Sequence, residues 1–157
     1  MASVQMVLHK IGTRQVVSVE LKGVKMQYEI EASPKTKRFI ESLLPSMFKQ
    51  LGLSNSKKYL FIKVDKDIEH AGETVPLLGL DSFIVAIKPT RNVVSLGVTL
   101  AHELVHVAQF AKGTLKPMPR GLKWAGKMYS KKTPYLDMPW EVQAFAKQEI
   151  IFRRAID

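Results

Sequence analysis

The sequence predicts an α+β fold in which short strands and one helix precede two further helices. Residues 59–62 and 83–87 are short runs of β-branched and aromatic residues, a composition typical of strands. Residues 92–113 instead repeat apolar side chains at steps of three and four, which is the period of a helix with one buried face. Residues 139–148 begin with a proline, which is well tolerated in the first turn of a helix. The chain has 157 residues, enough for one domain with a buried core, so we expect a single domain over residues 1–157.

The strands are predicted from alternation and from β-forming residues. Residues 15–22 and 24–31 each alternate apolar and polar positions on either side of a Lys-Gly pair, so a hairpin between them is predicted. Residues 58–64 and 82–88 are the other two strand candidates. Together they predict a small mixed or antiparallel sheet.

The first helix is predicted to follow Ser33-Pro34. Ser33 is a suitable N-cap, and apolar residues keep a helical period as far as Gly52, where a glycine favours the end of the helix. Pro45 lies inside this run. Because a proline lacks the N–H that an interior turn needs, Pro45 is expected to kink or divide the helix.

The second helix carries one apolar stripe, formed by Val93, Leu96, Leu100, Leu104 and Val107. Either Asn92 or Ser95 can cap its start, and Lys112-Gly113 is an ordinary helix end.

The same helix contains the motif His-Glu-Leu-Val-His at residues 102–106. Side chains four residues apart lie on one face of a helix, so His102 and His106 can reach the same ion. Neutral imidazole is a good zinc ligand, and Glu103 is placed to accept a proton from a water that attacks a carbonyl group. The alternative is a buried helix whose histidines only form hydrogen bonds with their neighbours.

A catalytic zinc ion takes three protein ligands, and no histidine follows His106. The carboxylates after that point are Asp137, Glu141, Glu149 and Asp157. The residues alone leave the choice among them open, and Glu141 also suits the first turn of a helix simply because of the helix dipole.

The combination of HELVHVAQ with PWEVQA resembles compact zincin metallopeptidases of the glutamate-zincin type, found in bacterial and phage proteins. The resemblance covers about residues 92–150 and implies a zincin-like fold. It also implies that His102, His106 and Glu141 hold Zn²⁺ while Glu103 is the general base. Many relatives have a second glutamate where this chain has Gln143, so any role that needs charge at this position is absent.

In such folds the strand before the active-site helix often forms the edge above the cleft. The resemblance therefore implies that residues 82–88 can pair with an extended substrate backbone. The alternative is an ordinary core strand. Tyr135, shortly before the predicted glutamate helix, is a candidate catalytic residue because its hydroxyl can donate a hydrogen bond to the oxyanion, although packing is the usual role of a tyrosine.

The chain has a formal net charge of +10, from 24 Lys and Arg against 14 Asp and Glu. Residues 112–132, here called the basic segment, are rich in lysine and also contain Trp124 and Tyr129. Lysines with interleaved aromatic residues can follow phosphates and stack bases, so nucleic acid is a possible partner. Solvated lysines on an exposed connection are the alternative, and the segment can also form one wall of the cleft.

These observations predict a zinc metallopeptidase, most simply an endopeptidase acting on a protein or peptide substrate. One alternative is a module associated with nucleic acid or a phage particle that keeps a structural zinc site with little turnover. Another is a peptidase that processes a single dedicated partner protein. The chain has no cysteine, and neither an export signal nor an uninterrupted apolar run of about 18 residues is evident, so we expect a cytoplasmic protein without membrane contact, or a virion-associated one if its origin is a phage.

Overall fold

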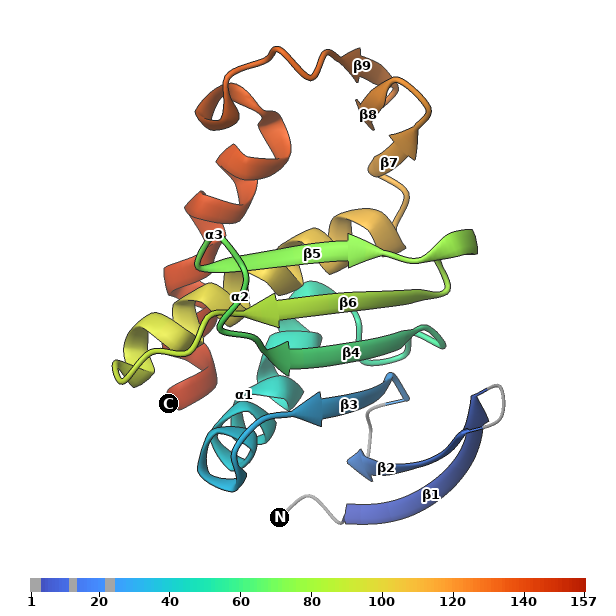
Figure 1. Ribbon diagram of the computed structural model, residues 1–157, viewed down its shortest axis with the longest axis vertical. Helices are drawn as coiled ribbons and strands as arrows, with labels where there is room; N and C mark the ends of the chain where they lie inside the picture. Colours follow the sequence, from blue (N-terminus) through green and yellow to red (C-terminus); the bar gives the residue numbers. More distant parts are fainter. Residues whose placement is uncertain (1–3, 12–13, 22–24) are drawn as a thin grey trace.

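The computed structural model describes residues 4–11, 14–21 and 25–157, and it confirms the α+β class (Figure 1). Three helices lie within these ranges: α1 (Pro34–Leu51), α2 (Val93–Ala111) and α3 (Pro139–Ile156). The strands are β1 (Val4–Ile11), β2 (Arg14–Leu21), β3 (Gln27–Glu31), β4 (Tyr59–Val64), β5 (Gly72–Pro76), β6 (Ser82–Ile87), β7 (Leu115–Met118), β8 (Gly121–Trp124) and β9 (Lys127–Tyr129). Short 3₁₀ turns at Leu78–Leu80 and Tyr135–Asp137 complete the elements.

A mixed four-stranded sheet forms the centre of the molecule, with the order β3-β4-β6-β5. β3, β4 and β6 are parallel, whereas β5 runs antiparallel to β6 at the edge. β6 is therefore an interior strand. The expectation that residues 82–88 form the edge strand above a cleft is wrong, and the core-strand alternative holds.

The predicted hairpin between residues 15–22 and 24–31 is also wrong. β2 pairs with β1 in a separate two-stranded antiparallel sheet, and β3 pairs in parallel with β4. Alternation identifies a strand but not its partner, and pairing with β4 lets Tyr28 and Ile30 of β3 enter the main core. The Lys22-Gly23 pair lies outside the described residues.

The caps predicted for α1 are confirmed. The Ser33 side chain accepts a hydrogen bond from the backbone N–H of Thr36, and Gly52 ends the helix with a φ of 68°. That left-handed conformation favours glycine because it lacks a Cβ. The helix continues through Pro45 from Pro34 to Leu51, so the proline does not divide it.

α1 and α2 cover one face of the main sheet (Figure 1). The side chains that alternate toward this face are fully buried and form one apolar cluster with the helices. Sheet members of this cluster include Leu60, Ile62, Phe83 and Val85, and helix members include Ile40, Leu44, Phe48, Leu100 and Leu104.

α2 is the most deeply buried helix of this core. Asn92 caps it by accepting hydrogen bonds from the N–H groups of Val94 and Ser95, as one of the two predicted caps. Among the described residues it is the one helix that is long and apolar enough to cross a membrane, with a mean hydropathy of 1.3, yet 72% of that window is buried inside the fold. This degree of burial of α2 is typical of a core helix in a globular protein.

α2 and α3 pack very closely where a glycine permits it. A Cβ at Gly97 of α2 would overlap the ring of Phe152 on α3. The small residue at position 97 therefore lets α2 approach the last turns of α3 closely.

The basic segment folds into a three-stranded antiparallel sheet, β7-β8-β9, rather than an irregular connection. Trp124 and Tyr129 of this sheet pack against Trp140 at the start of α3, with ring centroids 6.5 and 5.6 Å away. Leu115 and Leu122 face the same side and line a cleft. The expectation that this segment forms one wall of a cleft is confirmed.

Candidate metal centre

The two histidines of α2 and the glutamate of α3 meet at one buried point. His102 and His106 lie one turn apart on the same face of α2, and Glu141 lies in the first turn of α3. The Nε2 atoms of the histidines are 3.2 Å apart. The Glu141 carboxylate lies 3.2 Å from His102 Nε2 through Oε2 and 2.7 Å from His106 Nε2 through Oε1.

The spacing of the two imidazoles suits a tetrahedral metal ion. With metal–nitrogen bonds of about 2.0–2.1 Å, two ligand atoms of a tetrahedral zinc site lie roughly 3.3 Å apart. The 3.2 Å between the two Nε2 atoms agrees with that spacing. His102, His106 and Glu141 are also all buried, and their ligand atoms lie within 4.8 Å of one another. Two imidazoles and one carboxylate are a donor set typical of catalytic zinc.

Hydrogen bonds on the outer side of the imidazoles point both Nε2 atoms inward. Gln109 donates through its amide N–H groups to the Trp140 carbonyl and to Gln143 Oε1, both at 3.0 Å. Its Oε1 must then accept from His106 Nδ1, 2.8 Å away, which leaves a lone pair on Nε2.

His102 has the same arrangement. Its Nδ1 lies 2.9 Å from Oε1 of Gln148 on α3, which accepts the Nδ1 hydrogen. Neutral imidazoles in these tautomers direct two lone pairs at the point that the Glu141 carboxylate also faces. In the metal-free protein a hydrogen on Nε2 instead satisfies the Glu141 carboxylate, and a divalent cation can replace it and bind all three side chains, so the residues fit a divalent metal ion.

The charges of the site favour deprotonated Glu141. Burial would raise the pKa of Glu141, but its hydrogen bonds to His102 and His106 hold it far below the usual range. Burial would likewise lower the pKa of His106, yet the hydrogen bond and negative charge of Glu141 raise it above the ordinary value of 6.5. Glu141 is thus an anion that attracts positive charge to this point, as a proton or as a metal ion.

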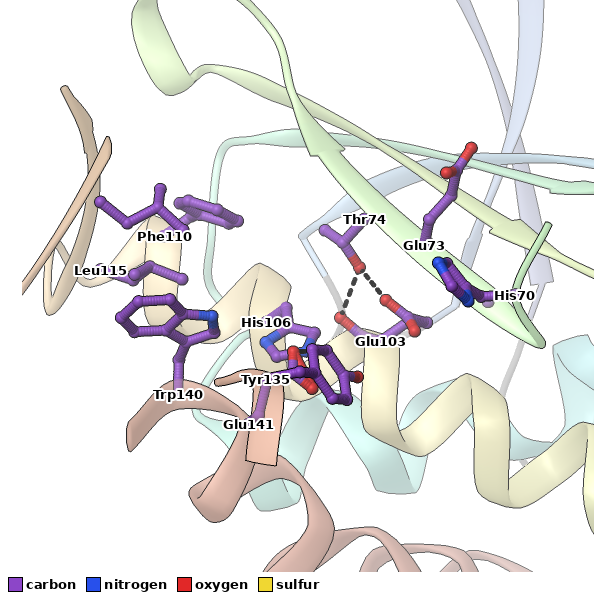
Figure 2. A pocket seen from close by; sticks show the side chains of 12 residues that line it. His70, Glu73, Thr74, Glu103, His106, Phe110, Leu115, Tyr135, Trp140 and Glu141 are labelled. Carbon is purple, nitrogen blue, oxygen red and sulfur yellow. Dashed lines mark hydrogen bonds and ion pairs between the residues drawn. The ribbon is translucent and has the colours of Figure 1, made fainter. Parts of the chain in front are cut away.

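Glu103 lies beside this point and is held by the edge strand β5. Its carboxylate is 5% exposed, and Oε2 accepts a 2.6 Å hydrogen bond from the hydroxyl of Thr74 (Figure 2). Burial raises the pKa of Glu103, while the Thr74 hydrogen bond and the two histidines oppose that rise. Gly72, two residues before Thr74 in β5, leaves room for this contact, because a Cβ there would lie 2.9 Å from Glu103 Oε1.

A cleft of about 650 Å³ opens onto these side chains. Figure 2 shows Phe110, Leu115 and Trp140 gathered at one end, and His70, Glu73 and Thr74 at the other, with His106 and Glu141 between them. The cleft therefore has an apolar end, formed by the β7–β9 sheet and the start of α3, and a polar end formed by β5 and the loop before it.

Tyr135 lines the same cleft and is 55% exposed. Its ring packs edge-on against Phe145 of α3, with a centroid distance of 6.2 Å. Partial burial and the nearby Glu141 carboxylate raise the pKa of Tyr135, so the hydroxyl keeps its proton and can act as a hydrogen-bond donor. Both interpretations of this residue, packing and donation into the cleft, are compatible with its position.

The other candidate carboxylates lie away from the centre. Asp137 and Glu149 are exposed, and Glu149 forms an ion pair with Arg153 one turn further along α3. Asp157 is the exposed last residue of the chain. Within the part of the chain that the structure describes, one group of metal-ligating side chains is found, and it consists of His102, His106 and Glu141.

Several residues of the site were missed from the sequence. Gln109, Gln148 and Thr74 contact the motif residues from outside, and nothing in the local pattern distinguishes them from surface polar residues. Gln143 was considered only for its missing charge, whereas its amide oxygen accepts a hydrogen bond from Gln109. His70 is an exposed residue at the polar end of the cleft.

Comparison of the chain with protein families, characterised proteins and solved structures gives no match. The geometry of the site therefore carries the functional argument.

Proposed function

We propose that this protein is a zinc-dependent metallopeptidase that hydrolyses peptide bonds of protein substrates, with a zincin-like arrangement of α2 and α3. Three side chains are proposed as ligands, His102, His106 and Glu141, and Glu103 as the general base. Tyr135 is proposed as a hydrogen-bond donor to the oxyanion.

The observation that carries this proposal is a group of three potential metal ligands in an open cleft, with a second carboxylate, that of Glu103, beside it. Structural zinc sites are closed by four protein ligands, whereas catalytic sites use three and leave one position free. The ligand set counted above has three members, and Glu103 faces the cleft while it is held by Thr74. This arrangement supports an enzyme over a module that keeps zinc only for stability.

The roles of the residues follow from their positions. A bound zinc ion would polarise the carbonyl group and make water a stronger acid. Glu103 takes the proton of the attacking water and then delivers it to the leaving amine. Thr74 donates to one carboxylate oxygen of Glu103, which leaves the other oxygen to accept the proton of the attacking water. Tyr135 can donate its hydroxyl hydrogen to the negative charge that develops on the carbonyl oxygen.

The test uses Glu103→Gln, because it removes the base without removing a proposed ligand. Protein purified without an added metal should contain about one zinc per chain in both forms. A proteomic cleavage screen with the wild type identifies substrates, and Glu103→Gln should cleave them at least about a hundredfold more slowly. Equal cleavage by both proteins would contradict the proposed mechanism. Full zinc occupancy in His102→Ala and His106→Ala would place the metal elsewhere.

A further inference from the structure

The basic segment has no acidic partner in its own sequence. No Asp or Glu occurs in residues 104–136, whereas the basic side chains there are Lys112, Lys116, Arg120, Lys123, Lys127, Lys131 and Lys132. Among the described residues, none of these side chains forms an ion pair with a carboxylate. The fold therefore leaves their charge available to another molecule.

Two of these lysines lie side by side on one face of the β7–β9 sheet, here called the lysine face, whereas Lys127 lies over the Tyr129 ring on the other face. Lys116 of β7 is directly opposite Lys123 of β8, and Met128 of β9 is directly opposite Lys123. Successive residues of a strand point to opposite faces, so this row lies on the face away from Leu115, Leu122 and the cleft. Like charges directly opposite each other in an antiparallel pair are destabilising. An anionic partner on this face would remove that cost.

The same sheet is continuous with the cleft. A second hollow of about 270 Å³ lies between β8, β9 and the start of α3, with Lys131 at its edge. It shares Leu122 and Trp140 with the cleft that holds the metal centre. Met118, two residues after Lys116 and therefore on the same face of β7, also lines the hollow, so the hollow connects the apolar end of the cleft to the edge of the lysine face.

We propose that this lysine face is a docking surface for an acidic segment of the protein substrate, lying outside the residues that are cut. The inference rests on the proposed peptidase function. The substrate class is a polypeptide that has an apolar residue near the cleaved bond and an acidic segment at some distance from it along the chain. The charged contacts raise substrate affinity and leave the chemical step unchanged.

A polypeptide fits this face better than a nucleic acid does. Trp124 and Tyr129, which in the sequence could stack bases, are turned inward and pack on Trp140. The row Lys116, Lys123 and Met128 offers point charges beside a flexible apolar side chain instead. Methionine adapts to varied side chains and is common on surfaces that bind peptides. Electrostatic attraction to phosphate remains, so nucleic acid is the competing outcome of the test.

The experiment measures binding without turnover, in the Glu103→Gln background. The probes are a labelled peptide of alternating Glu and Leu, the same peptide with Gln at every Glu, and a thymidine oligonucleotide. The Lys116→Gln/Lys123→Gln variant removes the facing pair. Lys35→Gln/Lys37→Gln is the matched control, because it removes the same charge from exposed positions on α1.

The Glu-Leu peptide should bind at least roughly tenfold more tightly than the Gln-Leu peptide at low salt. The facing-pair variant should lose most of this difference, and the α1 control should keep it. Equal losses in both variants would overturn the inference, since the effect would then be one of net charge. Tighter binding of the oligonucleotide through the same two lysines would also overturn it and assign the face to nucleic acid.

Cleavage separates this inference from the peptidase proposal. With wild-type catalytic residues and a protein substrate that carries an acidic segment, Lys116→Gln/Lys123→Gln should raise KM and leave kcat unchanged. An unchanged KM would overturn the link between the face and the cleft. If the Glu-Leu peptide binds as expected but the wild type cleaves no substrate in the screen, the peptidase proposal fails and the substrate assignment fails with it.

Discussion

At the scale of single residues, the proposed metal centre depends on which carboxylate supplies the third ligand. Glu141 lies within 3.2 Å of both imidazole Nε2 atoms, while Asp137 and Glu149 are exposed. Glu141→Ala should therefore weaken zinc binding by more than the roughly 10- to 100-fold that even the loss of an outer contact can cause. Asp137→Ala and Glu149→Ala are the matched controls and should bind zinc almost normally. Competition with a chromogenic chelator measures the affinities, and zinc release by either control would show that another carboxylate is the ligand.

A second prediction concerns Thr74, which positions the proposed base. Its hydroxyl donates a 2.6 Å hydrogen bond to Glu103, and such a bond to a charged group is worth about 1.5–3 kcal/mol. Thr74→Val keeps the shape but loses the donor, so kcat should fall roughly tenfold or more while zinc content stays normal. Thr74→Ser should restore most of the activity. If Thr74→Ser were as slow as Thr74→Val, the methyl group and not the hydroxyl would matter.

At the scale of elements, the sequence identified strands and helices better than their partners. The runs that became β4, β6, α1 and α2 were predicted close to their observed ends because apolar periodicity and caps are local signals. The pairing of β3 with β4 depends on a core that only the folded chain creates. β5, with the sequence GETVP, lacks a run of β-forming residues and was not predicted.

In the candidate site, too, the sequence predicts residues that follow from local patterns and misses those whose contacts depend on the folded chain. His102, Glu103 and His106 follow from helical spacing alone, and Glu141 came from the family resemblance. Thr74 reaches Glu103 from a strand 29 residues earlier, and Gln148 reaches His102 across 46 residues. Contacts over such separations depend on how α2 packs against β5 and α3, so no local sequence pattern predicts them.

The packing of α2 against α3 can be tested through Gly97. A methyl group there would overlap the ring of Phe152, so Gly97→Ala should lower the free energy of unfolding by about 1–3 kcal/mol. Ser95→Ala, at an exposed position of the same helix, should change it by less than about 0.5 kcal/mol. Denaturant unfolding measures both. Adding Phe152→Leu should recover part of the loss in Gly97→Ala, and strict additivity of the two changes would show that these side chains do not meet.

At the scale of the whole molecule, the proposed metal centre would join the two helices that carry the site to the rest of the core. α2 lies against the main sheet and α3 packs along α2, so an ion held by His102, His106 and Glu141 ties the C-terminal helix to the centre of the fold. Metal binding to the folded chain is then linked to its stability. Zinc at about 100 times its dissociation constant should add about 2.7 kcal/mol, or roughly 5–10 °C in Tm.

This stabilisation should depend on pH with a definite sign. In the metal-free protein the pKa of His106 is raised above 6.5 by Glu141, so the ion pair contributes stability below pH 6.5 that is lost as the pH rises through the raised value. Zinc must displace that proton, so its binding strengthens over the same interval. Glu141 stays ionised over this whole pH interval, because its pKa is lowered. Its ionisation contributes stability that is lost only when the pH falls below the ordinary value of 4.5.

The increase in Tm caused by zinc should therefore be larger at about pH 8 than at about pH 6, because both effects act in the same direction. Thermal unfolding of zinc-loaded and chelated protein across this interval measures the difference. Glu141→Ala is the control: without the carboxylate, zinc should stabilise the fold little at either pH. A zinc effect that is equal at both pH values in the wild type would mean that the ion does not compete with a proton at His106, and the ligand set proposed here would have to change.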